Sequence, residues 1–568
     1  MEKLKSYILS KNGITNDIEK YFISIWAELF NYDTIDTYRV RNKNAKSILL
    51  EFIDIIDTKF NEISSNENIK FITEEACRIV EKDIVLNKCY YKELEFLKKD
   101  LKKNVNFDFP SLKERLAKIK YFLNLFAKDY CENLVKELSE EIKTGDQEKI
   151  YKITSILATE LLNKGYSYMY LYELKNKFIL NEEADFLKSL NKILRDDLNK
   201  KYTLYIKFTF KSEIKDLVTN DIILNSVFKK KNNDENEASF IAQSGNFIAE
   251  INNIESLDHY NAVKKGINKF GFLLDLIKFE FRKDLVYISP KILVYDDTKT
   301  YYVDNKTKPI GFIQKGNIKN LEKIIDSISQ TMNNSLVDEI SKIKISNSVR
   351  YFRMSLDQPF TESRFLHLWI SLEFLMSTNN NTSVILEINK YIPKILGLGY
   401  PRKLLIDLIS NFKRIENINL FPTENKKNKF LKLYESIINE SDKTQLQNKI
   451  KSPLLKKRFE IVCEYFCNPK KLHNKINFHL DNVKWNLQRI YRLRNKIAHS
   501  ANIDINLEQI ESNLYFYYIS TINCILYNIR KTNTNQIEDV LLMKEANFDF
   551  LFNKLKGVDP KFDLKEWI

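Results

Sequence analysis

Three residues near the C-terminal end of the chain, Arg494, Asn495 and His499, have side chains suited to a group that develops negative charge. Histidine has an ordinary pKa near ~6.5, so its imidazole can take up or release a proton at neutral pH. Arginine stays charged and offers a planar fork of donors that fits phosphate or carboxylate oxygens. A proton carrier and a fixed cation therefore lie within six residues of each other, and we treat this segment as the first candidate site.

The residues before this segment predict the helix that positions it, over residues 481–499. Its apolar positions recur at spacings of four, three and seven: Val483, Leu487, Ile490 and Ile497. Arg494 falls within that stripe, where a guanidinium is costly unless an anion meets it. Five residues place Arg494 and His499 about 140° apart on a straight helix. The two side chains converge only if the helix ends before His499, or if two copies of the motif meet across a dimer.

Two segments match a known pattern. Residues 494–499 read R-N-x-x-x-H, which resembles the R-x4–6-H motif of the HEPN superfamily of ribonucleases. The stretch Arg364–Leu375, RFLHLWISLEFL, resembles the first helix of the Apea-like HEPN subgroup. The two segments occur in the order of that subgroup, and the likeness covers roughly residues 350–530. Nothing before this region resembles a family.

The resemblance implies a metal-independent endoribonuclease, with no cofactor, that cleaves RNA by attack of the 2′-OH and leaves a 2′,3′-cyclic phosphate. HEPN domains commonly pair to form one composite cleft, so the resemblance implies a homodimer through this domain, or a pseudo-dimer with a second helical domain. The resemblance also implies a role in phage defence or in a toxin system. The N-terminal part, residues 1 to about 315, would then restrain or trigger the nuclease and could carry a regulatory partner.

Four residues receive catalytic roles in this hypothesis. His499 moves protons, and Arg494 holds the charge that develops on the phosphate. Asn495 fixes the imidazole or binds a phosphate oxygen. Glu373, on the first helix of the resembling region, either pairs with Arg494 or orients His499; the alternative is a simple helix-stabilising ion pair.

Arg492 and Lys496 are interpreted as solvated residues or as substrate-binding contacts to phosphate. An alternative function from another class is also open. In a catalytically inactive HEPN-like scaffold, Arg494 and His499 would hold RNA, a nucleotide or a protein partner, or form a buried pair at the end of the helix. Loss of RNA cleavage in variants of both residues would favour the enzyme.

A second group of residues precedes the motif: Cys463, Cys467, His473 and His479. Their spacing, C-x3-C-x5-H-x5-H, could close a tetrahedral zinc site. The gap between the two pairs is much shorter than in familiar zinc fingers. The favoured interpretation is that the cysteines are core residues and the histidines loop residues, so we expect no metal. Walker-type, dinucleotide-binding and serine-hydrolase motifs are absent from the sequence.

Composition limits the class of protein. A chain of 568 residues is too long for one core, and 44% hydrophobic residues suffice for globular folding. A net charge of +14 mildly favours a polyanionic partner. The 6 cysteines are scattered, as in a reduced cytoplasmic protein. The N-terminus lacks the apolar region of a signal peptide, and no apolar run reaches the ~18 residues of a membrane span.

The chain is expected to be mainly α-helical because it holds only 11 glycines and 10 prolines. The boundaries predict a helical domain over 1–200, a small α+β module over 201–315, a HEPN-type helical bundle over 316–535, and a tail over 536–568 that packs on the body. In the first domain, helices are predicted after the cap Thr15–Asn16, over 48–63, from Pro110 to Gly145, over 148–163 and over 181–198.

In the α+β module, alternation over 204–210 predicts a strand with one buried face, and 291–295 with 300–303 predicts a hairpin. Residues 229–237 lack apolar side chains and are expected to form an exposed loop. In the bundle, helices are predicted over 361–376, 384–396 and 402–413, among others.

Overall fold

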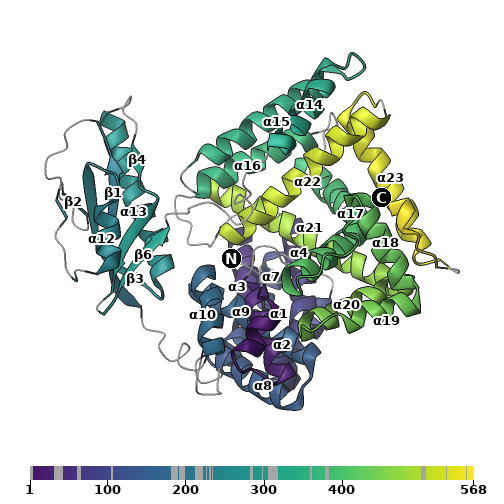
Figure 1. Ribbon diagram of the computed structural model, residues 1–568, viewed down its shortest axis with the longest axis horizontal. Coiled ribbons are helices and arrows are strands. Elements are labelled where there is room, and N and C mark those ends of the chain that lie inside the picture. Colours follow the sequence, from purple (N-terminus) through teal and green to yellow (C-terminus); the bar gives the residue numbers. More distant parts are fainter. Residues whose placement is uncertain are drawn as a thin grey trace. The chain divides into compact units, whose positions relative to one another are not determined.

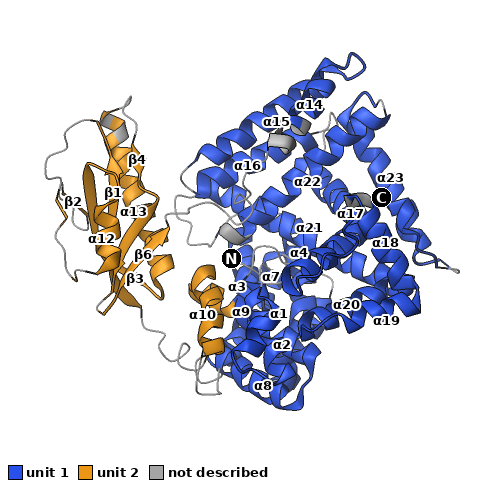
Figure 2. Cartoon of the chain, in the orientation of Figure 1, with its two compact units in different colours: residues 1–159, 309–568 blue, residues 160–308 orange. Residues whose placement is uncertain are grey.

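The computed structural model describes residues 4–30, 43–60, 66–103, 107–180, 190, 199–211, 222–225, 227–228, 232, 234–281, 286–296, 298–304, 318–358, 361–377, 383–499, 507–532, 534–557 and 560–567. Helices dominate, and one antiparallel sheet lies in the middle of the chain (Figure 1). The prediction of a mainly α protein with a small α+β module is therefore confirmed. The chain forms two compact units, residues 1–159 with 309–568 and residues 160–308 (Figure 2).

The first unit begins with a run of helices. They are α1 (Ser6–Lys11), α2 (Asp17–Leu29), α3 (Ala45–Phe60), α4 (Asn66–Glu81), α5 (Ile84–Cys89), α6 (Tyr91–Lys102), α7 (Phe109–Phe126), α8 (Tyr130–Thr144) and α9 (Gln147–Lys164), whose last residues pass into the second unit. The cap predicted before α2 is confirmed, because the Asn16 side chain accepts a hydrogen bond from the Ile18 amide. Phe22 and Trp26 on α2 are fully buried. The helix predicted over 181–198 lies outside the described residues, apart from residue 190.

The single helix predicted from Pro110 to Gly145 is wrong, because the chain forms α7 and α8 there. The break at residues 127–129 contains neither glycine nor proline. It is imposed by packing: α7 contacts α3 and α6, whereas α8 contacts α5. Tyr130, the first residue of α8, is fully buried and its hydroxyl donates to Asp83. Gly145 ends α8 as predicted, with a φ of +79°.

The remainder of the first unit is a helical assembly. Its helices are α14 (Ile318–Asn333), α15 (Glu339–Asp357), α16 (Thr361–Met376), α17 (Val384–Ile415), α18 (Lys426–Ile438), α19 (Glu440–Asn448), α20 (Pro453–Cys467), α21 (Pro469–His499), α22 (Glu508–Thr532), α23 (Ile537–Lys554) and α24 (Leu564–Trp567). The helix predicted over 361–376 is confirmed as α16. Two hydrophobic clusters support the assembly, one around Trp369 and one around Phe412.

The two helices predicted over 384–396 and 402–413 are instead one helix, α17, with Pro393 and Pro401 inside it. Each proline removes one backbone hydrogen bond, but α17 is buried along its length and contributes to both hydrophobic clusters. Tertiary packing therefore outweighs the local helix-breaking signal. Phe548 on α23 approaches Gly397 so closely that a Cβ there would lie 2.6 Å from its ring. With Trp567 of α24, it places the C-terminal helices in the second cluster.

The second unit contains the sheet. Its elements are α10 (Tyr168–Leu180), β1 (Lys200–Thr209), β2 (Ile222–Asn225), α12 (Glu235–Ile241), β3 (Phe247–Ser256), α13 (His259–Glu280), β4 (Tyr287–Ile288), β5 (Lys291–Tyr295) and β6 (Thr300–Asp304). The strand order is β2-β3-β1-β5-β6, with β4 paired to β1, and all pairs are antiparallel. The predicted hairpin is confirmed as β5–β6, in which Tyr295 pairs with Thr300.

Two local predictions in this unit are wrong. Strand β1 is buried on both faces, because Leu204 belongs to the cluster against α13 and Tyr205 to a second cluster on the opposite face. Phe240 of α12 belongs to that second cluster. Residues 229–237 were expected to be an exposed loop, but α12 begins at Glu235, capped by Asp234. Glu237 is fully buried and accepts from the Tyr295 hydroxyl, so its charge does not mark an exposed position.

The observed division differs from the four predicted segments. The structure joins the N-terminal helices and the C-terminal bundle in one unit, and it assigns α10 to the unit of the sheet. The reason is a set of contacts between segments far apart in the chain, such as α4 with α21 and α2 with α20. Sequence periodicity carries no information on such pairings. Among the described residues, no helix is both long and apolar enough to cross a membrane.

Candidate functional site

Helix α21 carries the motif and is held by the first hydrophobic cluster of the C-terminal bundle. Val483, Leu487 and Ile490 are fully buried there, as their spacing predicts. The stripe then continues through Leu493, whereas Ile497 is only partly buried. Arg494 consequently lies at the border of the buried face, with 33% of its side chain exposed. The helix thus anchors the motif firmly and leaves the guanidinium of Arg494 accessible.

Arg494 has modest polar contacts. Its Nη1 donates to Oδ1 of Asn495 at 3.1 Å, and its Nη2 lies 3.8 Å from Oε2 of Glu373. Among the described residues, Glu373 is the carboxylate that pairs with this guanidinium, and the distance of 3.8 Å between the two atoms is long for an ion pair. The structure therefore brings together three predicted site residues: Arg494, Asn495 and Glu373. Much of the guanidinium's donor capacity remains available to an incoming anion.

His499 is the last residue of α21, and its side chain lies outside the described part of the structure. Its predicted role as the proton carrier stays a prediction. The helix itself bears on the geometry, because α21 is continuous up to His499. Arg494 and His499 were expected to converge either because the helix ends before His499 or because two copies of the motif meet across a dimer. The backbone does not end before His499, so the first explanation does not apply.

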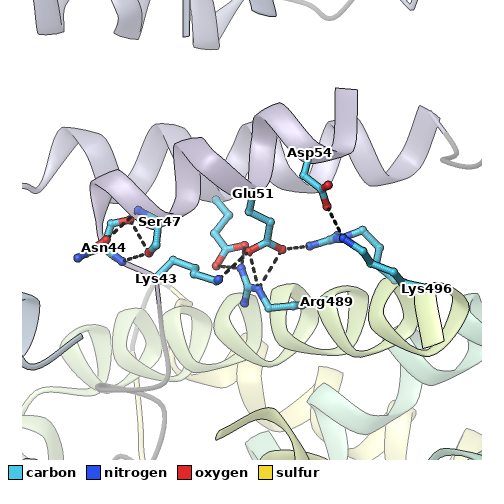
Figure 3. Close-up of polar contacts among 9 residues, drawn as sticks. Lys43, Asn44, Ser47, Glu51, Asp54, Arg489 and Lys496 are labelled. Atoms are coloured by element: carbon cyan, nitrogen blue, oxygen red, sulfur yellow. Dashed lines mark hydrogen bonds and ion pairs between the residues drawn. The ribbon is translucent and has the colours of Figure 1, made fainter. Parts of the chain in front are cut away.

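The two predicted phosphate contacts are paired with N-terminal helix α3. Arg492 Nη2 donates to Oε1 of Glu51 at 2.5 Å, and Lys496 Nζ lies 3.5 Å from Oδ2 of Asp54. Figure 3 shows Glu51 and Asp54 pointing from α3 toward α21. The interpretation of Arg492 as a solvated residue is wrong, since its side chain is 14% exposed; Lys496 is more open, at 37%.

Deeper in the same interface, Arg489 links α21 to both α3 and α4. Its Nε donates to both Glu51 oxygens at 3.0 and 2.9 Å (Figure 3). Its Nη2 donates to both Glu75 oxygens at 2.8 and 2.7 Å. The guanidinium is almost fully buried. A buried arginine that requires an anion was predicted at position 494; the structure places it at position 489.

The charges of this cluster change one another's protonation. Burial alone would raise the pKa of Glu51, but Arg489, Lys43 and Arg492 outweigh it and hold the pKa well below its usual range. Burial would lower the pKa of Arg489, whereas Glu51 and Glu75 raise it overall. The pKa of Lys43 is lowered, first by burial. Both Glu51 and Arg489 are therefore charged at neutral pH, as a paired network requires.

Local sequence explains how α3 presents its carboxylates. Asn44 and Ser47 form a reciprocal cap: the Ser47 amide donates to Asn44 Oδ1 at 2.8 Å, and the Asn44 amide donates to Ser47 Oγ at 3.0 Å. This cap sets the first turn of α3. Glu51 and Asp54 follow on adjacent turns, three residues apart, and so lie on one face. Figure 3 shows the cap at the end of the helix that carries them.

The four candidate zinc ligands do not converge. Cys463 is buried and Cys467 exposed on α20, and burial raises the pKa of the Cys463 thiol to about 12. His479 stacks on Tyr400 with ring centres 4.4 Å apart, and His473 stacks on Phe552 at 4.1 Å. No group of three or more His, Cys, Asp or Glu side chains in the described part of the chain is arranged to hold a metal ion. The histidines lie on helix α21 rather than in a loop.

The second unit has an open polar pocket of about 820 Å³ at the β5–β6 turn. Lys201, Asn253 and Lys299 are among the residues that line it. Asn253 adopts a left-handed conformation, with φ of 56°, opposite the irregularity in the β1–β3 register. The other polar groups of the pocket hold local structure; Asp296, for example, accepts from the backbone amides of its own turn. Asp296 is therefore engaged in holding the β5–β6 turn.

Sequence reasoning missed Glu51, Glu75 and Arg489, the most strongly coupled residues of this region. Arg489 is more than 400 residues from Glu51 and Glu75 in the chain, and no local pattern relates the three. In the sequence, Glu51 and Glu75 look like any other glutamate of an amphipathic helix. Comparison with protein families, with curated proteins and with solved structures finds no match for this chain. The HEPN likeness accordingly rests on the residues of α16 and α21 alone.

Proposed function

We propose that this protein is a metal-independent endoribonuclease of the HEPN type. The observation that supports the proposal most directly is the state of Arg494. It is anchored at the border of a buried helix face, yet one third of its side chain is exposed and its recorded carboxylate contact within the described residues is 3.8 Å away. A fixed, accessible guanidinium beside an amide side chain is suited to phosphate oxygens.

In the proposed reaction, His499 accepts the proton of the ribose 2′-OH. The 2′-oxygen then bonds to the adjacent phosphorus, the bond to the 5′-oxygen breaks, and that oxygen takes up a proton. The products are a 2′,3′-cyclic phosphate and a free 5′-OH. Arg494 stabilises the charge on the phosphate oxygens at the transition state, a contribution of ~3–4 kcal/mol for one well-placed donor. Asn495 orients a phosphate oxygen or the imidazole, and Glu373 positions Arg494.

The proposed active form is a homodimer through the C-terminal bundle. On one straight helix Arg494 and His499 face about 140° apart, and α21 continues to His499. Convergence across two copies of the motif resolves this difficulty. We further propose that the nuclease acts in the cytoplasm in phage defence or in a toxin system, and that the N-terminal part responds to a regulatory partner or signal.

A catalytically inactive RNA-binding or partner-binding scaffold is the second candidate. The observation that favours it is that Arg492 and Lys496, the predicted phosphate contacts, are already paired with Glu51 and Asp54. These ion pairs stabilise the packing of α21 against α3, so the presence of the two cations does not require a nucleic-acid ligand. In a scaffold of this kind, Arg494 would bind a phosphate or a partner carboxylate without any proton transfer.

Incubation of the purified chain with RNA in EDTA separates the two candidates. We expect the wild type to cleave and to leave cyclic phosphate ends, and we expect Arg494→Ala and His499→Ala each to lose cleavage while keeping their fold by circular dichroism. Arg353→Ala is the matched control, because Arg353 is exposed on α15 and pairs only with Asp357 one turn on among the described residues. Equal RNA binding without cleavage in every variant would support the scaffold.

A further inference from the structure

Most ion pairs between the N-terminal helices and the C-terminal bundle have the same charge polarity. Carboxylates of the N-terminal helices meet cations of the bundle: Glu28 with Arg458, Glu51 with Arg489 and Arg492, Glu75 with Arg489, and Asp54 with Lys496. One pair has the opposite sense, Arg78 with Asp481. Among the described residues, the two hydrophobic clusters of the bundle draw on residues from Ile328 onward. At the other pairs, the N-terminal helices present carboxylates to cations of the bundle.

The cations on α21 form a row along one face, at positions 489, 492 and 496. Burial falls steadily along this row: the Arg489 side chain is 4% exposed, that of Arg492 14%, and that of Lys496 37%. The partner at the open end, Asp54, is 57% exposed. Exposed pairs are weak and screened by salt, whereas the buried end is held by two carboxylates. The row thus opens most easily at Lys496, its exposed end.

Carboxylate and phosphate oxygens use the same donors on arginine and lysine. Glu51 and Asp54 therefore occupy the positions that phosphates of a polyanion would take on Arg492 and Lys496. We propose that α3 acts as an internal competitor of RNA: its carboxylates block the basic row of α21, and RNA engages Arg492 and Lys496 only when they are displaced. This inference rests on the proposed function, since it takes RNA as the ligand of α21.

The ion pair of Arg489 with Glu75 does not involve α3 and can therefore persist when α3 is displaced. Glu75 lies on α4 and contacts only the innermost cation of the row among the described residues, so Arg489 remains paired when α3 loses its hold on Arg492 and Lys496. RNA then gains two cations on the side of α21 that faces α3, about 160° around the helix from Arg494, without exposing an unpaired buried arginine. A signal that moves α3 would therefore increase RNA binding directly.

The test uses the full chain and a fluorescent 2′-O-methyl RNA, which lacks the attacking hydroxyl and so reports binding alone. We compare Asp54→Asn and Glu51→Gln/Asp54→Asn with the wild type. Asp54→Asn alone is included in case the double variant misfolds, because Glu51 pairs with Lys43, Arg489 and Arg492. The matched control is Glu67→Gln/Glu74→Gln on α4, which changes the net charge equally at exposed positions. Cleavage of unmodified RNA is measured in parallel.

We expect the double variant to bind about tenfold tighter than the wild type and with a steeper salt dependence, and the control to change about twofold or less. We also expect 2′-O-methyl RNA to increase hydrogen exchange in α3 of the wild type. The proposal that α3 competes with RNA is overturned if a folded Asp54→Asn or Glu51→Gln/Asp54→Asn variant binds RNA as the wild type does. It is also overturned if RNA binds and hydrogen exchange in α3 stays unchanged. Tighter RNA binding by the double variant, with no cleavage by any variant, supports α3 as a competitor of RNA and rejects the proposed nuclease activity. Cleavage that is equal in all variants supports the nuclease activity and rejects α3 as a competitor.

Discussion

Arg489 on α21 and Glu75 on α4 form a two-point contact across 414 residues of sequence, with Arg489 Nη2 2.8 and 2.7 Å from the two carboxylate oxygens. Both side chains are 4% exposed. The contact fastens the helix that carries the motif to the N-terminal helices. Five residues on, Arg494 has the same charge but an accessible side chain. Arg489 and Arg494 on α21 therefore differ in burial, so their replacement should have separable effects on stability and on RNA cleavage.

Replacement of Arg489 by alanine should destabilise the first unit by about 3–5 kcal/mol, because it leaves the buried Glu75 carboxylate without this partner and removes one of the three cations around Glu51. Urea unfolding of the full chain measures the effect. Arg530→Ala, at an exposed position near the end of α22, should change the free energy of unfolding by no more than about 0.5 kcal/mol. A similarly small effect of Arg489→Ala would contradict the structural role assigned to this cluster.

Replacement of Arg494 by alanine should change stability by less than about 1 kcal/mol, since its ion pair is long and partly exposed. RNA cleavage should fall by about 100- to 1,000-fold, through loss of transition-state stabilisation. Arg494→Lys should restore only part of the rate, because an ammonium lacks the planar fork of donors. Single-turnover cleavage at saturating enzyme measures these rates. A variant that cleaves like the wild type would remove Arg494 from the mechanism.

Stability of the first unit should depend on the charge of Glu51. Its pKa in the folded chain lies below the ordinary value of 4.5, so its contribution is present above pH 4.5 and is lost as the pH falls toward the lower folded value. Glu51→Gln should be less stable than the wild type at pH 7, and the gap should narrow below pH 4.5. Urea unfolding between pH 7 and pH 3 tests this, and a constant gap would refute it.

The second unit should lose stability in mild acid through His259. This imidazole stacks on Tyr301 at 4.1 Å, and burial lowers its pKa to about 4 from the ordinary 6.5. Between those values the unfolded chain binds the proton more readily, so stability falls as the pH drops from 6.5 to 4, by up to about 3 kcal/mol. His259→Phe keeps an aromatic ring and should remove this dependence. Hydrogen exchange of β3 and β6, corrected for intrinsic rates, is the measurement; equal pH profiles would argue against it.

Local patterns predicted the elements whose structure depends on neighbours in sequence. Helix α16 begins and ends where its apolar spacing predicts, and the β5–β6 hairpin follows its turn residues. The prediction failed where packing opposes a local signal. The break between α7 and α8 has no glycine or proline, and α17 continues through Pro393 and Pro401. In both places the buried contacts of each helix decide its path.

For the candidate site, the amino-acid sequence by itself determined that α21 has one apolar face and that Arg494, Asn495 and His499 follow it. Tertiary structure alone decided which arginine is buried and what covers the row of cations. The apolar periodicity of a helix reports the face that meets its nearest core, but the opposite face of α21 is covered by α3 and α4, more than 400 residues earlier. Charge pairing at that distance depends on how the helices dock, and no spacing within either segment encodes it.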